Sequence, residues 1–305
     1  MIKSLSYIGQ RSSSVLILGL LLAALLPSVS SALRPALPLL VSLVLGLAIA
    51  RLDVLQVMRE FTELRKSLLL FGIVLLFMPL TCMLLVWVWR LFQLDESGVL
   101  LLIVFAAAPP LSSATSLSLL LGFNARITLQ VTLLATIASP ILGPLCFPLV
   151  GLSVDFEIVA IALRIALMIA GGFALGLGVQ AIVGKAAIGQ NTEAFNGIVA
   201  LSMVLFLFPL FDGVIIHIIM APLQSFMVLI LAIALNLGGN LVTRGISQRF
   251  STPPTSGALG LMFGNRNVSF YLAVLPFNPL LSVFVAASQI PMYATPALFG
   301  KNRPG

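Results

Sequence analysis

Long apolar stretches alternate with short polar connections along the whole chain. A helix needs about 20 mostly apolar residues to cross a lipid bilayer. Ten stretches approach or exceed that length: 14–30, 36–50, 67–89, 97–122, 125–150, 156–183, 193–213, 218–243, 253–275 and 280–299. The pattern therefore predicts an all-α polytopic membrane protein with ten transmembrane helices and no separate soluble domain.

The first stretch has a second interpretation. Lys3 and Arg11 precede the apolar run SVLILGLLLAALL, and the small-residue segment PSVSSA follows it, as in a cleavable signal peptide. Cleavage within residues 1–31 would remove one helix from the first half of the chain. We favour a retained span because it completes an internal repeat, and the alternative stays open.

Composition agrees with a membrane protein. Of the 305 residues, 60% are apolar and only 8% are charged, against roughly 25% charged in soluble domains. So few charges exclude a soluble globular protein, a disordered chain and a coiled coil. Cys82 and Cys146 both lie in apolar runs without a CxxC spacing, which excludes a disulfide scaffold.

The distribution of basic residues predicts the topology. Twelve of the 16 Lys and Arg residues fall in segments on the same side of the membrane as the N-terminus. Only Arg34 and Arg90 fall in connections on the opposite side. Because cytoplasmic loops carry the excess of Lys and Arg, we expect a multi-pass protein of the cell (inner) membrane with both termini in the cytoplasm. The net charge of +7 thus reflects the lipid bilayer as partner, not nucleic acid.

Two predicted spans carry polar interruptions. The fourth reads AAAPPLSSATSLS over 106–118, and the ninth reads GLMFGNRNVSF over 260–270. Two successive prolines remove two backbone donors and disfavour a continuous helix. The polar and proline side chains at these breaks are the candidate substrate-binding residues: Pro110, Ser112, Ser113, Thr115, Asn265, Arg266 and Asn267.

The two breaks occupy corresponding positions in the two halves of the chain. Ser112 and Gly264 are 152 residues apart, as are Pro144 and Pro296. Five spans per half is an odd number, so the second repeat (151–305) must be inverted relative to the first (1–150). Inverted repeats with interrupted helices at matching positions are typical of secondary transporters with a site at mid-membrane.

At this point the sequence resembles a known family. The ten-span layout, the APPLSSATS break followed by NARITLQVTLLATIASPILGP, and the late FGNRN segment are similar to the bile acid:sodium symporter family over nearly the whole chain. The resemblance implies a panel domain and a core domain, each drawn from both repeats, with broken helices 4 and 9 crossing in the core. It also implies transport of small organic anions, such as steroid conjugates or carboxylates, usually with sodium.

The resemblance is uneven at the ion sites. It places sodium-ligating hydroxyls at Thr115, Thr128 and Thr132. However, Met262 stands where the family commonly has a glutamate, and Arg266 stands where it has a ligating amide. A guanidinium beside a sodium ion is electrostatically unfavourable. We therefore expect sodium coupling to be weak or absent, and no other cofactor.

Arg266 itself has two interpretations. A buried arginine in a membrane helix is costly unless it is paired or hydrated, and no Asp or Glu lies at mid-membrane in the predicted spans. Arg266 is either a fixed cation that replaces one sodium ion and receives an anionic substrate, or a structural residue bonded to backbone carbonyls of the broken fourth helix or to Asp212.

Other functions fit the sequence less well. An arsenite-type carrier would need a cysteine where the chain has Ala106 to Ala108, whereas a related auxin-efflux-like carrier remains an alternative, as does a non-transporting channel or sensor. An intramembrane enzyme would need a catalytic cluster of residues such as His, Asp and Glu. The chain has a single histidine, His217, so we expect no enzymatic activity. The oligomeric state is unreadable, because the Gly172–Gly176 pair fits packing within one bundle as well as a dimer.

Overall fold

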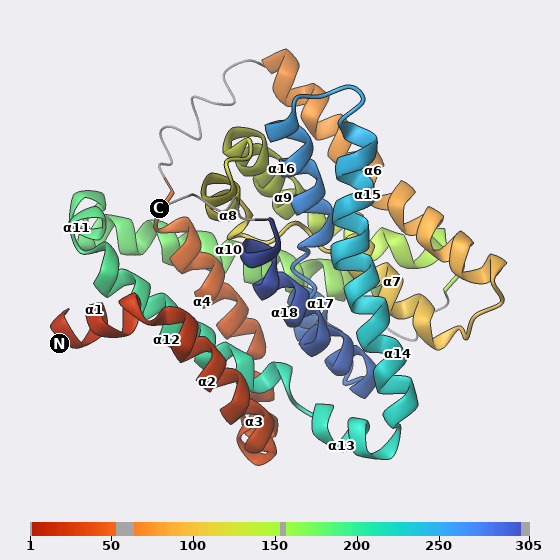
Figure 1. Ribbon diagram of the computed structural model, residues 1–305, viewed down its shortest axis with the longest axis horizontal. Coiled ribbons are helices and arrows are strands. Elements are labelled where there is room, and N and C mark those ends of the chain that lie inside the picture. Colours follow the sequence, from red (N-terminus) through yellow and green to blue (C-terminus); the bar gives the residue numbers. More distant parts are fainter. Residues whose placement is uncertain (1, 53–63, 153–156, 300–305) are drawn as a thin grey trace. The chain divides into compact units, whose positions relative to one another are not determined.

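The computed structural model describes residues 2–52, 64–152 and 157–299, and within these ranges every regular element is a helix (Figure 1). Six of the described helices are long and apolar enough to cross a membrane, or seven if the bent pair near the N-terminus counts as one span. The chain is therefore an all-helical polytopic membrane protein. The finer count of ten spans stays a prediction.

The predicted spans can be compared with the helices one by one. Each of the ten stretches falls mostly on helical residues, and the start of the sixth, at 156, lies outside the described residues. The first is divided at Leu26, where α2 (Ser12–Leu25) ends and α3 (Pro27–Leu33) begins, because Pro27 has no N–H to continue α2. The fourth and ninth are each divided into two short halves, none of which is long enough to span a bilayer alone.

The chain divides into two compact units, and each takes residues from both halves of the sequence. The first unit comprises 1–53, 166–225 and 272–283, and the second comprises 54–165, 226–271 and 284–305. Four helices run along the chain from one unit into the other: α10 (Ile158–Val183), α14 (Pro222–Ile233), α17 (Ser269–Val274) and α18 (Pro279–Phe299).

In the first unit, α12 (Thr192–Leu210) is the central helix. It packs against α1 (Ile2–Gln10), α2, α3 and α4 (Leu37–Ile49). The remaining short elements of this unit are η1 (Arg34–Ala36), α11 (Lys185–Gln190) and α13 (Val214–Met220).

The Gly172–Gly176 pair of α10 is used inside the first unit. A Cβ added at Gly172 would lie 2.7 Å from the Leu45 side chain, and one at Gly176 would lie 2.7 Å from the Gly46 carbonyl oxygen. The pair therefore lets α10 approach α4 closely, which accounts for this motif without a second copy of the chain. Gln180, one turn further along α10, donates to the terminal carbonyls of α4 at Ile49 and Ala50.

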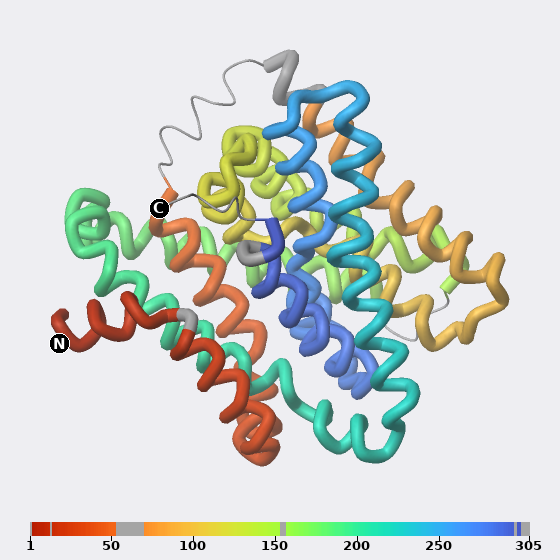
Figure 2. Tube along the Cα trace, in the orientation of Figure 1, coloured from red at the N-terminus to blue at the C-terminus, as the bar shows by residue number. Residues whose placement is uncertain are grey.

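The second unit contains the two interrupted helices. Its elements are α6 (Leu64–Leu91), α7 (Ser97–Ala107), α8 (Ala114–Leu121), α9 (Ala125–Leu149), the π-turn η2 (Ala234–Gly238), α15 (Gly239–Ser247) and α16 (Pro253–Gly264). α6 packs against α7 and α9, and α15 packs against α16. Figure 2 shows the chain reversing between α15 and α16.

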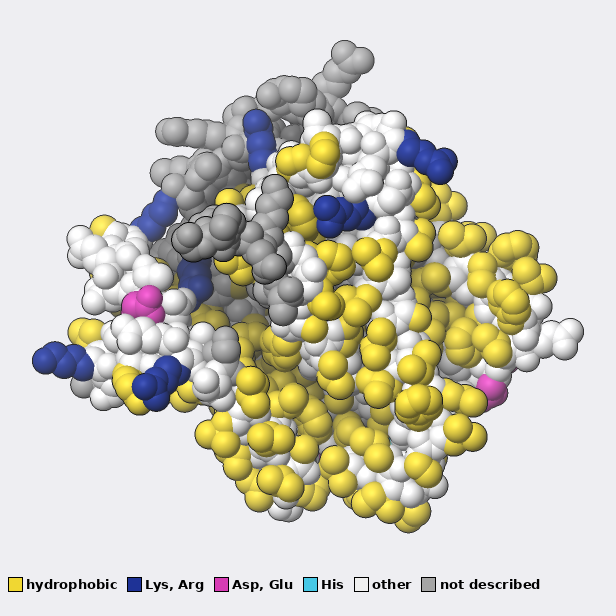
Figure 3. Space-filling view, in the orientation of Figure 1, with side chains coloured by type: hydrophobic (Ala, Val, Ile, Leu, Met, Phe, Trp, Pro, Cys, Tyr) yellow, Lys and Arg dark blue, Asp and Glu magenta, His cyan; other side chains and the backbone are white. Residues whose placement is uncertain are grey.

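The surface of α14 and α15 has the polarity expected of a membrane-spanning segment. Exposed side chains include Phe226, Met227, Ile230, Leu241 and Val242. Figure 3 shows hydrophobic side chains along this face, with Lys and Arg side chains near the end where α15 turns into α16. This arrangement matches an apolar belt bounded by a charged interface.

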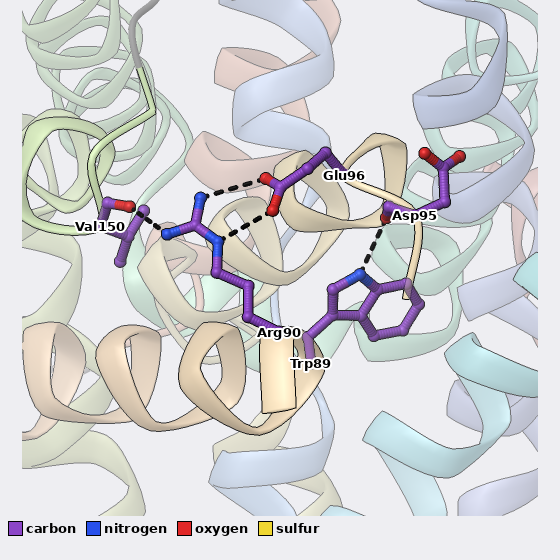
Figure 4. A network of polar contacts seen from close by, with 5 residues as sticks. All are labelled: Trp89, Arg90, Asp95, Glu96 and Val150. Atoms are coloured by element: carbon purple, nitrogen blue, oxygen red, sulfur yellow. Dashed lines mark hydrogen bonds and ion pairs between the residues drawn. The ribbon is translucent and has the colours of Figure 1, made fainter. Parts of the chain in front are cut away.

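The loop between α6 and α7 is held by a small polar network (Figure 4). Arg90 donates to both carboxylate oxygens of Glu96 at 3.0 Å and to the Val150 carbonyl at 2.8 Å. The Trp89 indole N–H donates to the Asp95 carbonyl at 2.8 Å. The network therefore ties the end of α6 to the start of α7 and to the end of α9.

The Glu96 contact predicts a pH dependence. The hydrogen bonds from Arg90 lower the pKa of Glu96 from its ordinary value of 4.5. Its contribution to stability is therefore present at neutral pH and is lost as the pH falls through the lowered pKa. We expect Glu96→Gln to lower the Tm by about 1–2 °C at neutral pH. The two melting curves should converge in acid, and a Tm difference that persists there would contradict this assignment.

Candidate functional site

The first break lies between α7 and α8. Ala108 has an extended backbone (φ −69°, ψ 137°), as expected of a residue that precedes a proline. Pro109 and Pro110 cannot donate backbone hydrogen bonds, so α7 ends and the chain resumes a helix only at Ala114. The predicted interruption of the helix is therefore confirmed at these residues, and its place in a fourth membrane span stays a prediction.

The second break lies between α16 and α17. Gly264 is the last residue of α16, and Asn265 leaves the helical conformation (φ −96°, ψ 85°). The next helix, α17, begins at Ser269. The predicted interruption of the second helix is confirmed as well.

The two breaks lie side by side, and their backbones pair. Pro110 and Arg266 form an isolated antiparallel bridge. The Leu111 N–H donates to the Asn265 carbonyl at 2.9 Å, and the Asn267 N–H donates to the Pro109 carbonyl at 2.8 Å. Backbone groups at membrane depth must find partners within the protein, and each break supplies partners for the other.

Arg266 bonds to the carbonyl ends of both broken helices. Its Nη1 donates to the Ala108 carbonyl at 2.9 Å, just beyond the end of α7, and its Nε donates to the Phe263 carbonyl at 3.1 Å, in the last turn of α16. The residue is 3% exposed. Its guanidinium carbon lies 5.7 Å from the centre of the Phe77 ring and 5.5 Å from that of Phe263.

This placement has a simple electrostatic cause. The C-terminal end of a helix carries a partial negative charge on its unpaired carbonyls, and a cation there is stabilised. One guanidinium serves two such ends at once. The interpretation of Arg266 as a residue bonded to the broken fourth helix is confirmed, and its role as a receptor for an anion stays a prediction.

Two residues that the sequence analysis did not assign to the site complete these bonds. The Tyr271 hydroxyl donates to the Ala107 carbonyl at 3.3 Å, so that Ala107, Ala108 and Pro109 all accept from the segment 266–271. The side chain of Asn236 donates to the Gly264 carbonyl at 2.7 Å and to Asn265 Oδ1 at 2.9 Å. Both Tyr271 and Asn236 are buried.

The polar residues after the first break are more accessible. Ser112 and Thr115 are half-buried and Ser113 is exposed. Ser113 is the N-cap residue of α8, and its side chain makes no capping hydrogen bond. The first N–H groups of a helix lack partners within that helix and carry partial positive charge. This end of α8 can therefore donate hydrogen bonds to an anion.

The three threonines expected to ligate sodium differ in their environments. The Thr128 hydroxyl is engaged, because it lies 2.8 Å from Ser118 Oγ and donates to the Asn124 carbonyl at 3.0 Å. Thr132 Oγ1 is buried and has no hydrogen-bond partner among the described residues. Thr115 lies in the first turn of α8. Met262, where the resemblance would place a carboxylate, is buried in α16.

Comparisons with known proteins add no identity. No protein-family model matches the chain, and no curated protein matches it.

Proposed function

We propose that the protein is a secondary membrane transporter of small organic anions, with weak or absent coupling to sodium. The observation that carries this proposal is that Arg266 donates hydrogen bonds to the carbonyl ends of both interrupted helices, α7 and α16. In an interrupted helix those carbonyl ends attract cations, and the opposing N-terminal ends attract anions. Here the protein supplies its own cation, and the start of α8 remains for an anion.

The proposed roles follow from burial. Because Arg266 is buried, it acts on the anion through its field in a medium of low dielectric constant. Ser112, Ser113 and Thr115 contact the anion directly with their hydroxyls and backbone N–H groups. A sodium ion near the breaks would have to compete with a guanidinium already bonded to the Ala108 and Phe263 carbonyls.

The proposed architecture is two inverted five-helix repeats, 1–150 and 151–305, with both termini in the cytoplasm of a bacterial-type cell. The pairing of the two breaks supports it. So does the division into two units that each draw on both halves of the chain, as a panel and a core domain would. The resemblance to bile acid:sodium symporters supports the same arrangement.

Uptake into proteoliposomes tests the function. The probes are radiolabelled taurocholate, as a steroid conjugate, and pyruvate, as a small carboxylate. We expect one of them to accumulate equally with an inward sodium gradient and with potassium in place of sodium. Arg266→Gln keeps two N–H donors but loses the charge, and it should lower uptake about tenfold or more. Arg266→Lys keeps the charge and should retain part of the uptake.

Three results would contradict the proposal. Sodium-driven uptake that is unchanged in Arg266→Gln would mean that the family's ordinary symport mechanism operates. Entry of both probes at a rate that does not saturate with concentration would indicate a channel, and no movement of either probe would indicate a sensor.

A further inference from the structure

Asn265 has a buried hydrogen-bond donor without a partner. The residue is 1% exposed, and its Nδ2 atom makes no hydrogen bond with any described residue. Its other polar atoms are occupied, because Oδ1 accepts from Asn236 and the backbone carbonyl accepts from the Leu111 N–H. Leaving a buried N–H unpaired costs free energy, so this donor requires a ligand or a water molecule.

Asn236 fixes which atom of Asn265 is left over. A side-chain amide has two N–H donors and one carbonyl oxygen. Both N–H groups of Asn236 are used, one on the Gly264 carbonyl at 2.7 Å and one on Asn265 Oδ1 at 2.9 Å. Because Asn236 presents donors, Asn265 must turn its oxygen toward it and its Nδ2 away.

The local backbone is shaped to allow this contact. Asn236 lies in the π-turn η2, a rare interruption of a helix that is frequent at functional sites. A Cβ added at Gly264 would overlap the Asn236 carbonyl oxygen, and one at Gly260 would lie 2.6 Å from the Asn240 carbonyl oxygen. The two glycines of α16 therefore let the amide of Asn236 reach the second break.

We propose that Asn265 Nδ2 binds the transported anion, and that Asn236 is a positioning residue that makes the site select hydrogen-bond acceptors. The inference rests on the proposed transport of organic anions. It adds a reason why the site selects anions over cations. An outward-facing amide oxygen would favour cations, whereas Nδ2 together with the Arg266 charge repels them. The preferred group on the substrate is a carboxylate or a sulfonate, which accepts hydrogen bonds and has none to donate.

Asn265→Asp is the direct test. The substitution is isosteric and keeps an oxygen for Asn236, but it replaces the free N–H donor by a negatively charged oxygen. In the proteoliposome assay we expect the KM for the transported probe, taurocholate or pyruvate, to rise about tenfold or more. Asn240→Asp is the matched control, because Asn240 is 3% exposed, as is Asn236, and its Oδ1 faces Gly260, one turn before the break. Its KM should stay within about twofold of wild type.

Asn236→Asp tests the positioning role. An aspartate accepts where Asn236 donates, so the Asn265 amide should rotate and present its oxygen. We expect KM to rise as in Asn265→Asp while the maximal rate per folded protein changes little. A purely structural role would instead lower the yield of monodisperse protein and the maximal rate together. Thermal stabilisation of the detergent-solubilised protein by the same probe gives an independent measure of binding.

The outcomes separate the two proposals. Wild-type protein that neither binds nor accumulates either probe would overturn the proposed function and this inference with it. Wild-type uptake with an unchanged KM in both Asn265→Asp and Asn236→Asp would overturn only the inference, and would mean that a water molecule occupies the donor. If Asn236→Asp does not fold, Asn265→Asp decides the matter alone.

Discussion

Arg266→Met is expected to lower the free energy of unfolding by about 2–4 kcal/mol. The buried Ala108 carbonyl would lose its donor at about 1–3 kcal/mol, and the half-buried Phe263 carbonyl would lose its donor at a smaller cost. Methionine has a similar volume and also relieves the cost of burying a charge, which offsets part of the loss. We expect a net loss of stability because the substitution removes the guanidinium donor but leaves the backbone carbonyls, which no side-chain substitution can remove.

Reversible unfolding in mixed detergent micelles measures this difference. Arg266→Lys should fall between wild type and Arg266→Met, since an ammonium group is a cation but lacks the fork that reaches two carbonyls. Arg249→Met provides the matched control, because Arg249 is exposed at the end of α15, and its effect should stay within about 0.5 kcal/mol. An Arg266→Met protein as stable as wild type would show that these bonds do not hold the breaks together.

Gly264→Ala is expected to cost about 2–4 kcal/mol of unfolding free energy. The new methyl group would overlap the Asn236 backbone carbonyl, which belongs to a helix and cannot rotate away as a side chain can. Overpacking of this kind costs about 1–3 kcal/mol. Separation of α16 from η2 would also lengthen both hydrogen bonds of the Asn236 amide.

The same unfolding experiment contains its own control. Gly245 lies in α15 and has open space where a Cβ would be added. Gly245→Ala should therefore stabilise the protein by about 0.4–1 kcal/mol, because alanine restricts the unfolded chain and favours helix. Opposite signs at the two glycines are the expected result, and a loss of stability at both would point to a general effect of substitution.

The positions of the two breaks could be predicted from the sequence because their causes are local. Pro109 and Pro110 lack N–H groups, and the GNRN segment from Gly264 places consecutive polar residues in an apolar stretch. The helix boundaries in the second half of the chain follow the apolar stretches closely for the same reason. α10 and α18, for example, begin and end within a few residues of the predicted limits.

The partners of the site residues could not be predicted in this way. Tyr271 donates to the Ala107 carbonyl, which lies 164 residues away in the sequence. Asn236 donates to the Gly264 carbonyl on another helix. Such pairs depend on how helices pack, and a single sequence carries no signal for them. The burial of Arg266 beside two aromatic rings is of the same kind. Asn236 and Asn240 lie one helical turn apart with two glycines between them, a spacing that favours close packing but does not predict the π-turn.

The charge of Arg266 stays with the chain when a ligand dissociates, and this has an electrical consequence for the transport that we propose. A symporter that carries enough sodium with a monovalent anion can move it inward despite an inside-negative membrane potential. A carrier whose only countercharge is part of the protein moves one net negative charge per anion. A potential of 100 mV then favours outward movement by about 2.3 kcal/mol. Net flux through such a protein would follow the voltage, and outward currents of organic anion would exceed inward ones at equal concentrations.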